Sequence, residues 1–319
     1  MDGDLTPGPP RPLPVLPVEP REYVGFYRTP RFRWWHSAVA LCVFIIVWGA
    51  AVVGTTIAAV LYEMLEGGAT PEELAQGLLT PGLFLANNLG IALAIPAALV
   101  AHRAVFGQRA GWLFSIQGRF RWAMLRRFLL VAAVVHVVAL ASWLAANGAP
   151  ESLRVRPETP FLLVVVLLTT PLQAAGEEFA FRGLAARAVG SWFYSPPVGL
   201  VVSTAVTALL FMLVHRAGDL RLNALYLCLA LTASMLTWRG GGLEAAIALH
   251  VVSNLTTMLF LPLLGLEGFF DRGPGTGSQQ ALAQGAAVIL TAAALLWQIR
   301  RMDIPVRTAP AAPVLSRSS

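Results

Sequence analysis

The sequence predicts an all-α fold, a polytopic bundle of about eight transmembrane helices with both termini in the cytoplasm. The 319 residues are 56% hydrophobic and 13% charged, with a mean hydropathy of +0.66. Soluble domains carry about 25% charged residues. Several apolar runs reach about 20 residues, the length of a membrane-spanning helix. All 23 basic residues are arginines that favour alternate connecting segments. We attribute the net charge of +6 to membrane orientation and expect no nucleic acid partner.

The first segment, residues 1–36, contains eight prolines and no long apolar run. It also lacks the apolar stretch of a signal peptide. This composition predicts a disordered, proline-rich cytoplasmic tail. The run from Arg31 to Trp35 at its end is typical of an anchor at the membrane interface.

Residues 37–302 are predicted to form the transmembrane domain, followed by a disordered tail at 303–319. Runs of apolar residues separated by charged or proline-rich connections define the helices in order. The predicted spans are 37–62, 82–102, 128–146, 160–188, 197–216, 221–239, 243–264 and 279–299.

The arginines set the predicted orientation. With the N-terminus in the cytoplasm, 18 arginines fall in or beside cytoplasmic segments and 5 fall on the other side. Cytoplasmic loops of membrane proteins carry an excess of basic residues. The loop 63–81 has four glutamates and no arginine, as expected of the outer side. The protein is therefore expected to be a multi-pass protein of a cell membrane, in a bacterium the plasma membrane.

The stretch from Ala174 to Arg187 places carboxylates next to the apolar run that starts at Phe161. An unpartnered carboxylate in hydrocarbon is costly, so ionisable residues there mark candidate functional sites. Glu178 and Arg182 are four residues apart, share a helix face and can form an ion pair. Glu177 is rotated by about 100° from Glu178 and can face a cavity instead.

Two later helices also carry polar residues at helical spacing. Phe211 and His215 are four residues apart near the end of the fifth span, and His250 and Asn254 share a face of the seventh. The alternative interpretation of His215 is a histidine at the membrane interface. The alternative for His250 and Asn254 is a pair that forms hydrogen bonds between helices.

The three motifs occur in this order on the fourth, fifth and seventh membrane helices, and together they resemble the CPBP family of intramembrane endopeptidases, the CAAX-protease and bacteriocin-processing (Abi) proteins. The matching strings are Glu177-Glu178-Phe-Ala-Phe-Arg182, Phe211-Met-Leu-Val-His215 and His250-Val-Val-Ser-Asn254. The resemblance covers about residues 160–264. Each motif alone is weak, and the three together are specific.

The resemblance implies a hydrolase that cleaves a peptide bond of a membrane-associated or lipidated protein or peptide, similar to CAAX prenyl protease 2. Glu177 would activate water as the general base with help from His215, and His250 and Asn254 would stabilise the oxyanion. Glu178, Arg182 and Phe211 would support the site. The expected partners are membrane lipid and a peptide or protein substrate.

Two alternatives of other classes stay open. One is a non-catalytic bacteriocin-immunity or scaffold protein that keeps the motifs as structure. The other is an ion- or proton-coupled transporter, which needs polar groups across the full membrane depth. Spans one, two, three and eight are nearly free of charge, which favours a local site.

The cofactor is either absent or Zn²⁺. Glu177, His215 and His250 form a ligand set that zinc proteases use, so a metalloprotease is one interpretation. A glutamate protease without metal is the other and is slightly preferred. The sequence has no H-E-x-x-H helix, whose two histidines share one face.

The depths of these residues pose a problem. With 1.5 Å per residue, Glu177 is expected near the cytoplasmic side of the membrane and His215 near the opposite side. The hypothesis nevertheless requires Glu177, His215, His250 and Asn254 to converge.

Overall fold

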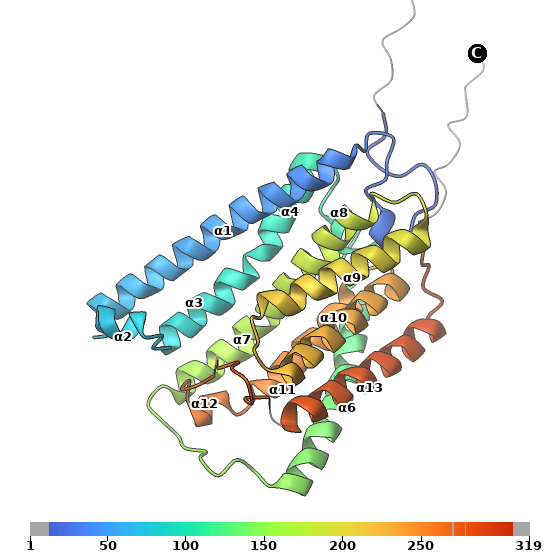
Figure 1. Ribbon diagram of the computed structural model, residues 1–319. Helices are drawn as coiled ribbons and strands as arrows, with labels where there is room; N and C mark the ends of the chain where they lie inside the picture. Colours follow the sequence, from blue (N-terminus) through green and yellow to red (C-terminus); the bar gives the residue numbers. More distant parts are fainter. Residues whose placement is uncertain (1–12, 270, 278, 309–319) are drawn as a thin grey trace, which may run out of the picture.

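The computed structural model describes residues 13–269, 271–277 and 279–308, which form a bundle of helices (Figure 1). Within these residues, eight helical segments are long and apolar enough to span a membrane, and they confirm the predicted fold class. They are α1 (Trp34–Leu65), α3 with α4 (Pro81–Ala92 and Ala94–Phe106), α6 (Trp122–Asn147), α7 through α8 (Thr159–Gly190), α9 (Pro196–Val214), α10 (Leu220–Gly240), α11 with α12 (Glu244–Thr257 and Leu261–Leu264) and α13 (Gln279–Arg301).

Short elements connect these spans. They are η1 (Tyr23–Gly25), α2 (Pro71–Ala75) and α5 (Gly111–Phe114). Outside the helices of the described ranges, strand-like pairing is limited to two isolated bridges, between Glu22 and Arg307 and between Ser115 and Gly242. The chain is a multi-pass membrane protein without a sheet in the part that the structure describes.

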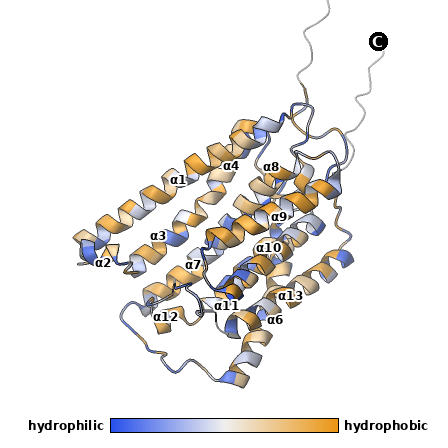
Figure 2. Cartoon of the chain, viewed as in Figure 1, coloured by the Kyte–Doolittle hydropathy of each residue, from blue (hydrophilic) through white to orange (hydrophobic). Residues whose placement is uncertain are grey.

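The outer helices turn apolar side chains to the outside. Figure 2 shows hydrophobic residues along the whole length of α1. Only four of its 32 residues are buried, whereas Ile45 and Ile46 are exposed. A helix with an exposed apolar surface of this length is stable in lipid and not in water.

The innermost helix is α11. Its residues from Glu244 to Ser253 are all buried, and it packs against α6, α7, α10 and α13. At its start, the carboxylate of Glu244 accepts hydrogen bonds from the backbone and side chain of Arg121, at 2.9 and 3.0 Å. This buried ion pair fixes α11 to the beginning of α6.

The fourth span is one continuous helix of three parts. α7 ends at Glu178, a π-helical turn (η2) covers Phe179–Ala185, and α8 ends at Gly190. Its 32 residues correspond to about 48 Å, longer than the hydrocarbon core of about 30 Å. A π-helical turn widens a helix and occurs most often at functional sites. This turn contains Arg182.

Small residues let the helices approach closely around this span. A Cβ atom on Gly176 would lie 2.5 Å from the carbonyl oxygen of Ile91, so α7 and α3 meet backbone to backbone there. A Cβ atom on Gly199 would lie 2.7 Å from the carbonyl oxygen of Gly190. The second contact aligns the start of α9 with the end of α8.

The N-terminal segment differs from the sequence prediction of a disordered tail over residues 1–36. Residues 13–33 pack on one end of the bundle, and α1 already begins at Trp34. Tyr23 and Tyr27 are fully buried, and the Tyr23 hydroxyl donates to the carbonyl oxygen of Leu113 at 2.6 Å. Aromatic side chains among the prolines supply the apolar area that holds this segment in place. Residues 1–12 lie outside the described residues.

Arg187 of α8 is the buried cation beneath this segment. Its guanidinium lies 3.7 Å from the ring centroid of Tyr23 and 5.0 Å from that of Phe26, and it donates to the carbonyl oxygen of Trp112 at 2.6 Å. A cation over aromatic faces is stabilised by their quadrupoles, more so when both are desolvated. The N-terminal segment is thus attached to the end of the fourth span.

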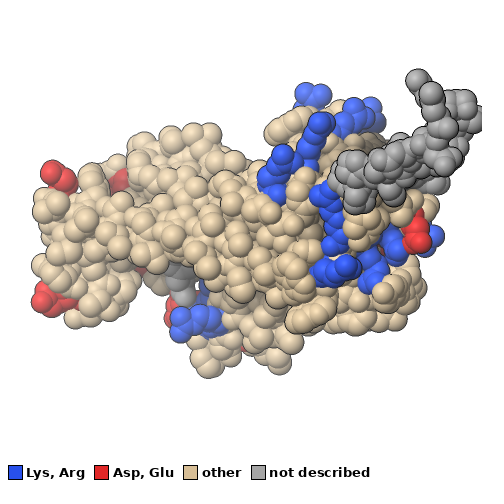
Figure 3. Space-filling view, turned by 90° about the horizontal axis from the view of Figure 1, so that it is seen from above, with Lys and Arg blue, Asp and Glu red and all other residues tan. Residues whose placement is uncertain are grey.

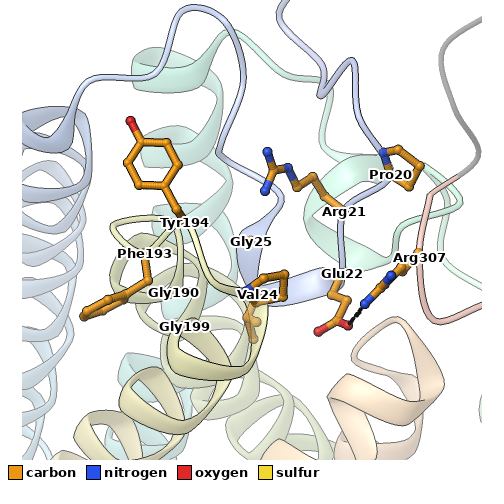
Figure 4. A pocket seen from close by; sticks show the side chains of 11 residues that line it. Pro20, Arg21, Glu22, Val24, Gly25, Gly190, Phe193, Tyr194, Gly199 and Arg307 are labelled. Carbon is orange, nitrogen blue, oxygen red and sulfur yellow. Dashed lines mark hydrogen bonds and ion pairs between the residues drawn. The ribbon is translucent and has the colours of Figure 1, made fainter.

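The C-terminal segment joins the same structure, although a disordered tail was predicted for residues 303–319. The backbone N–H of Thr308 donates to the carbonyl oxygen of Arg21 at 3.0 Å, and Arg307 forms an ion pair with Glu22 at 3.1 Å. Figure 4 shows this ion pair at the edge of a small pocket that also includes Tyr194. Residues 309–319 lie outside the described residues.

Charge is distributed unevenly over the surface. Figure 3 shows most of the arginines at the end of the molecule from which the terminal segments leave, and acidic side chains at the far end. This arrangement agrees with the predicted cytoplasmic position of both termini, which remains a prediction.

Candidate active site

The three motifs come from adjacent helices in the interior of the bundle. Glu177 and Glu178 end α7, and Arg182 follows in η2; His250 and Asn254 lie on α11; Phe211 and His215 lie at the end of α9. α11 packs against α7, and α9 contacts η2. The fold therefore brings together residues that are up to 77 positions apart in the sequence.

Glu178 is the buried centre of a charge cluster. It has no exposed surface, and its Oε1 accepts hydrogen bonds from Arg182 Nη1 at 2.9 Å and from His250 Nδ1 at 2.8 Å. The contact with Arg182 is the ion pair that the spacing of four residues predicts. Arg182 in turn lies over the ring of Phe211 at 4.6 Å. Each charge in this cluster has a partner, as a buried charge requires.

His250 connects the two glutamates. Because the Glu178 carboxylate can only accept, His250 Nδ1 carries a hydrogen. Its other nitrogen, Nε2, lies 3.6 Å from Oε2 of Glu177. That distance is too long for a direct hydrogen bond and leaves both atoms free to contact one reactant oxygen between them.

Glu177 differs from its neighbour in being partly exposed, although each glutamate has one buried oxygen without a hydrogen-bond partner among the described residues. Its side chain keeps 12% of its surface exposed. Oε1 accepts a hydrogen bond from Gln173 Nε2, whereas the buried Oε2 has no hydrogen-bond partner among the described residues. A buried carboxylate oxygen without a partner is costly, so its retention calls for a chemical explanation.

Gln173 is a site residue that sequence reasoning missed. Its Oε1 accepts from Asn254 Nδ2 at 3.1 Å while its Nε2 donates to Glu177, so one buried amide connects α7 with α11. The available signal was its spacing: Gln173 precedes Glu177 by four residues and shares its helix face.

His215 packs against Phe211, and the ring of Phe211 also lies close to His250. Its Nδ1 lies 2.7 Å from the carbonyl oxygen of Phe211, and its ring stacks on Tyr226 with centroids 4.0 Å apart. The Phe211 ring centroid is 4.6 Å from that of His215 and 5.8 Å from that of His250. The two imidazole centroids are thus at most about 10 Å apart, the sum of those distances. Glu177 also lies within electrostatic range of His215.

The depth problem disappears in the structure because the contact between the end of the fourth span and the start of α9 fixes the relative depth of the two residues. From the contact between Gly190 and Gly199, Glu177 lies 13 residues back along one helix and His215 lies 16 residues forward along the next. These separations correspond to about 20 Å and about 24 Å. The two side chains are therefore at similar depths.

The zinc ligand set of Glu177, His215 and His250 fits this arrangement poorly. Within the described residues, no group of three His, Cys, Asp or Glu side chains is placed to hold a metal ion. Nε2 of His250 and Oε2 of Glu177 lie 3.6 Å apart, whereas Nδ1 of His215 is directed to the carbonyl oxygen of Phe211 and its ring stacks on Tyr226. We therefore assign no step of the reaction to zinc.

Comparison with known proteins gives one match. Residues 159–256 match the family model described as type II CAAX prenyl endopeptidase Rce1-like. No curated protein and no solved structure matches the chain. The matched segment runs from the first residue of α7 almost to the end of α11, and it contains every residue of the three motifs.

Proposed function

Through residues 159–256 the chain belongs to the CPBP family of CAAX-type intramembrane proteases, and from this premise we propose that it hydrolyses a peptide bond of a membrane-associated or lipidated protein, with Glu177 as the base that activates water. The observation that carries this proposal is the free Oε2 of Glu177, which lies 3.6 Å from His250 Nε2 while its other oxygen is held by Gln173.

Water activation requires a base with a free lone pair at a fixed position. The hydrogen bond from Gln173 fixes the carboxylate plane of Glu177 and leaves Oε2 as the proton acceptor. Oε2 would take a proton from water as the water oxygen attacks the scissile carbonyl, and would later give that proton to the leaving amine. His215 would help to orient the water from the other side of Phe211.

Two donors are available for the oxyanion that forms on the carbonyl. His250 donates to Glu178 through Nδ1, and its Nε2 lies on the side of Glu177, where it would donate to the oxyanion once it carries a hydrogen. Asn254 uses one N–H on Gln173 and retains a second. Pre-oriented donors of this kind typically contribute a factor of about 10² to 10³ each to kcat. His250 and Asn254 are the proposed oxyanion donors.

We place this protein in a bacterial plasma membrane with both termini in the cytoplasm. The concentration of arginines at the end of the bundle that carries the terminal segments supports this orientation (Figure 3). The family description supports a peptide or protein substrate, and the prenylated C-a-a-X group is the first class to test.

The function is tested by searching for the cleaved bond. Purified protein in nanodiscs is incubated with quenched-fluorescent peptides ending in C-a-a-X, with and without a prenyl group, and with membranes of the producing cell. New peptide termini are then identified by mass spectrometry. We expect cleavage that continues in excess EDTA and 1,10-phenanthroline. Loss of cleavage on chelation, restored by Zn²⁺, would establish a metalloprotease; no new termini in any sample would refute the protease.

Gln173→Met is expected to lower kcat by about 10- to 100-fold and to change KM by less than about twofold. The substitution keeps the volume of the side chain but removes both hydrogen bonds, so Glu177 and Asn254 lose their common orientation at a cost of about 1–3 kcal/mol. Steady-state kinetics measures both constants.

Gln108→Met, in the connection between α4 and α5, is the matched control. Its buried amide donates to the carbonyl oxygen of Val15 at 2.8 Å and belongs to neither the proposed active site nor the pocket between α6, α11 and α13. Both variants lose one buried amide, so kcat should fall only in the first. Equal kcat values for the two variants would show that Gln173 has no positioning role.

A further inference from the structure

A second pocket, mainly apolar with several polar side chains, lies between α6, α11 and α13. Its cavity volume is about 40 Å³, or about 410 Å³ when the space open to the outside is included. None of the residues of the proposed active site lines it. Its polar lining residues are His136, Trp143, Thr256, Thr257, Gln280 and Gln284.

His136 is the buried end of this pocket. Its side chain belongs to the middle of α6, and the residue is 1% exposed. Nδ1 lies 3.1 Å from the carbonyl oxygen of Ala132 and 3.1 Å from Oγ1 of Thr291. Nε2 is buried and has no hydrogen-bond partner among the described residues. A buried nitrogen without a partner is destabilising, and a hydrogen bond from a ligand in the pocket would remove that cost.

A hydroxyl is the group that suits this nitrogen. If Nδ1 carries the hydrogen and donates to Ala132, then Nε2 offers a lone pair. If Thr291 donates to Nδ1, then Nε2 carries the hydrogen instead. A hydroxyl both donates and accepts, so it satisfies Nε2 in either tautomer.

The remaining lining selects a neutral, partly apolar ligand. The pocket has no charged residue, and Ala139, Leu140, Ala283 and Ala287 form its apolar side. Seven residues of α6, about 10 Å, separate His136 from Trp143. Thr257 and Gln280 are exposed and mark the opening, whereas His136 marks the buried end. A charged headgroup would lose its hydration there without gaining a counter-ion.

We propose that this pocket binds a neutral, hydroxyl-bearing amphiphile of the monoacylglycerol type. Its hydroxyl hydrogen-bonds to Nε2 of His136, and its acyl chain lies against the apolar side formed by Leu140 and Ala283. This lipid site is independent of the proposed peptide hydrolysis, because the two share no residue: α6 and α13 contribute none to the proposed active site, and α11 contributes Thr256 and Thr257 to the pocket instead of His250 and Asn254.

The site is tested with a 1-monoacylglycerol that carries a diazirine and an alkyne in its acyl chain. The full-length protein in phosphatidylcholine nanodiscs is photolysed with this probe, and labelled peptides are mapped by mass spectrometry. The matched probe is its 2,3-di-O-methyl ether, which has the same chain and no hydroxyl. We expect labelling of peptides around Trp143 and Gln280, and at least fivefold less labelling by the ether.

Substitutions in the protein provide a second test of the proposed lipid site. His136→Phe fills a similar volume without Nε2 and should reduce labelling at least fivefold, whereas Ser142→Ala, on the exposed side of α6, should leave it unchanged. Equal labelling of the wild type by the two probes would overturn the proposal without any variant. Effective competition by oleoyl-lysophosphatidic acid would overturn neutrality, and effective competition by free glycerol would overturn the lipid source.

Discussion

Glu177→Gln is expected to lower kcat by about 10²- to 10⁴-fold, the range over which general-base catalysis contributes. The variant has nearly the same shape, and its amide oxygen can still accept from Gln173, so the local hydrogen bonds are preserved. It lacks only the basic oxygen next to His250 Nε2. Single-turnover cleavage of an identified substrate, with the thermal unfolding temperature measured in parallel, separates lost chemistry from lost fold.

The control is Glu267→Gln, an exposed carboxylate after α12 that does not belong to the site. It should keep full activity. Retained cleavage in Glu177→Gln would refute the base assignment. A biological activity that survives in Glu177→Gln without any cleavage would favour the non-catalytic immunity or scaffold protein. Ion flux that Glu177→Gln abolishes, with no peptide cleavage by the wild type, would favour the transporter.

The membrane spans could be predicted because lipid imposes a simple rule. Each spanning helix needs about 20 apolar residues, and charged or proline-rich connections separate them. The structure places helices at all eight predicted runs. The fourth span was predicted at 160–188 and is observed at Thr159–Gly190, but neither the π-helical turn inside it nor the contact between Gly190 and Gly199 was predictable. That contact sets the relative depth of Glu177 and His215.

The terminal segments show where composition misleads. Prolines predict an extended backbone, and the segment before α1 is indeed largely non-helical. Its position depends on tertiary contacts instead, above all the burial of Tyr23 and Tyr27 beside Arg187. Sequence periodicity describes contacts within one helix. It therefore cannot predict that Tyr23 and Tyr27 pack over Arg187, about 160 positions later in the chain.

Within the site, contacts along one helix were predictable and contacts between helices were not. The spacing of Glu178 and Arg182 predicts their ion pair directly. The bond from His250 to Glu178 depends on how α11 is rotated against α7, which no single segment encodes. For the same reason the structure, and not the sequence, shows Gln173 between Glu177 and Asn254.

Arg182→Leu is expected to destabilise the protein by about 3–5 kcal/mol, the usual effect of removing one partner from a buried ion pair. Glu178 would remain fully buried, with His250 as its only other hydrogen-bond partner among the described residues. The π-helical turn would also lose the guanidinium that lies over Phe211. Unfolding in increasing SDS, followed by tryptophan fluorescence or proteolysis, measures the difference from the wild type.

The double variant Glu178→Gln/Arg182→Leu decides whether charge is the cause. Its neutral amide can still accept from His250, and position 178 no longer carries an uncompensated carboxylate, so the double variant should be more stable than Arg182→Leu alone. If the double variant is instead less stable than the single one, Arg182 acts mainly through its packing on Phe211. Recovered stability together with low kcat would show that Glu178 both neutralises Arg182 and holds His250 in its donating form, a role distinct from that of the neighbouring Glu177.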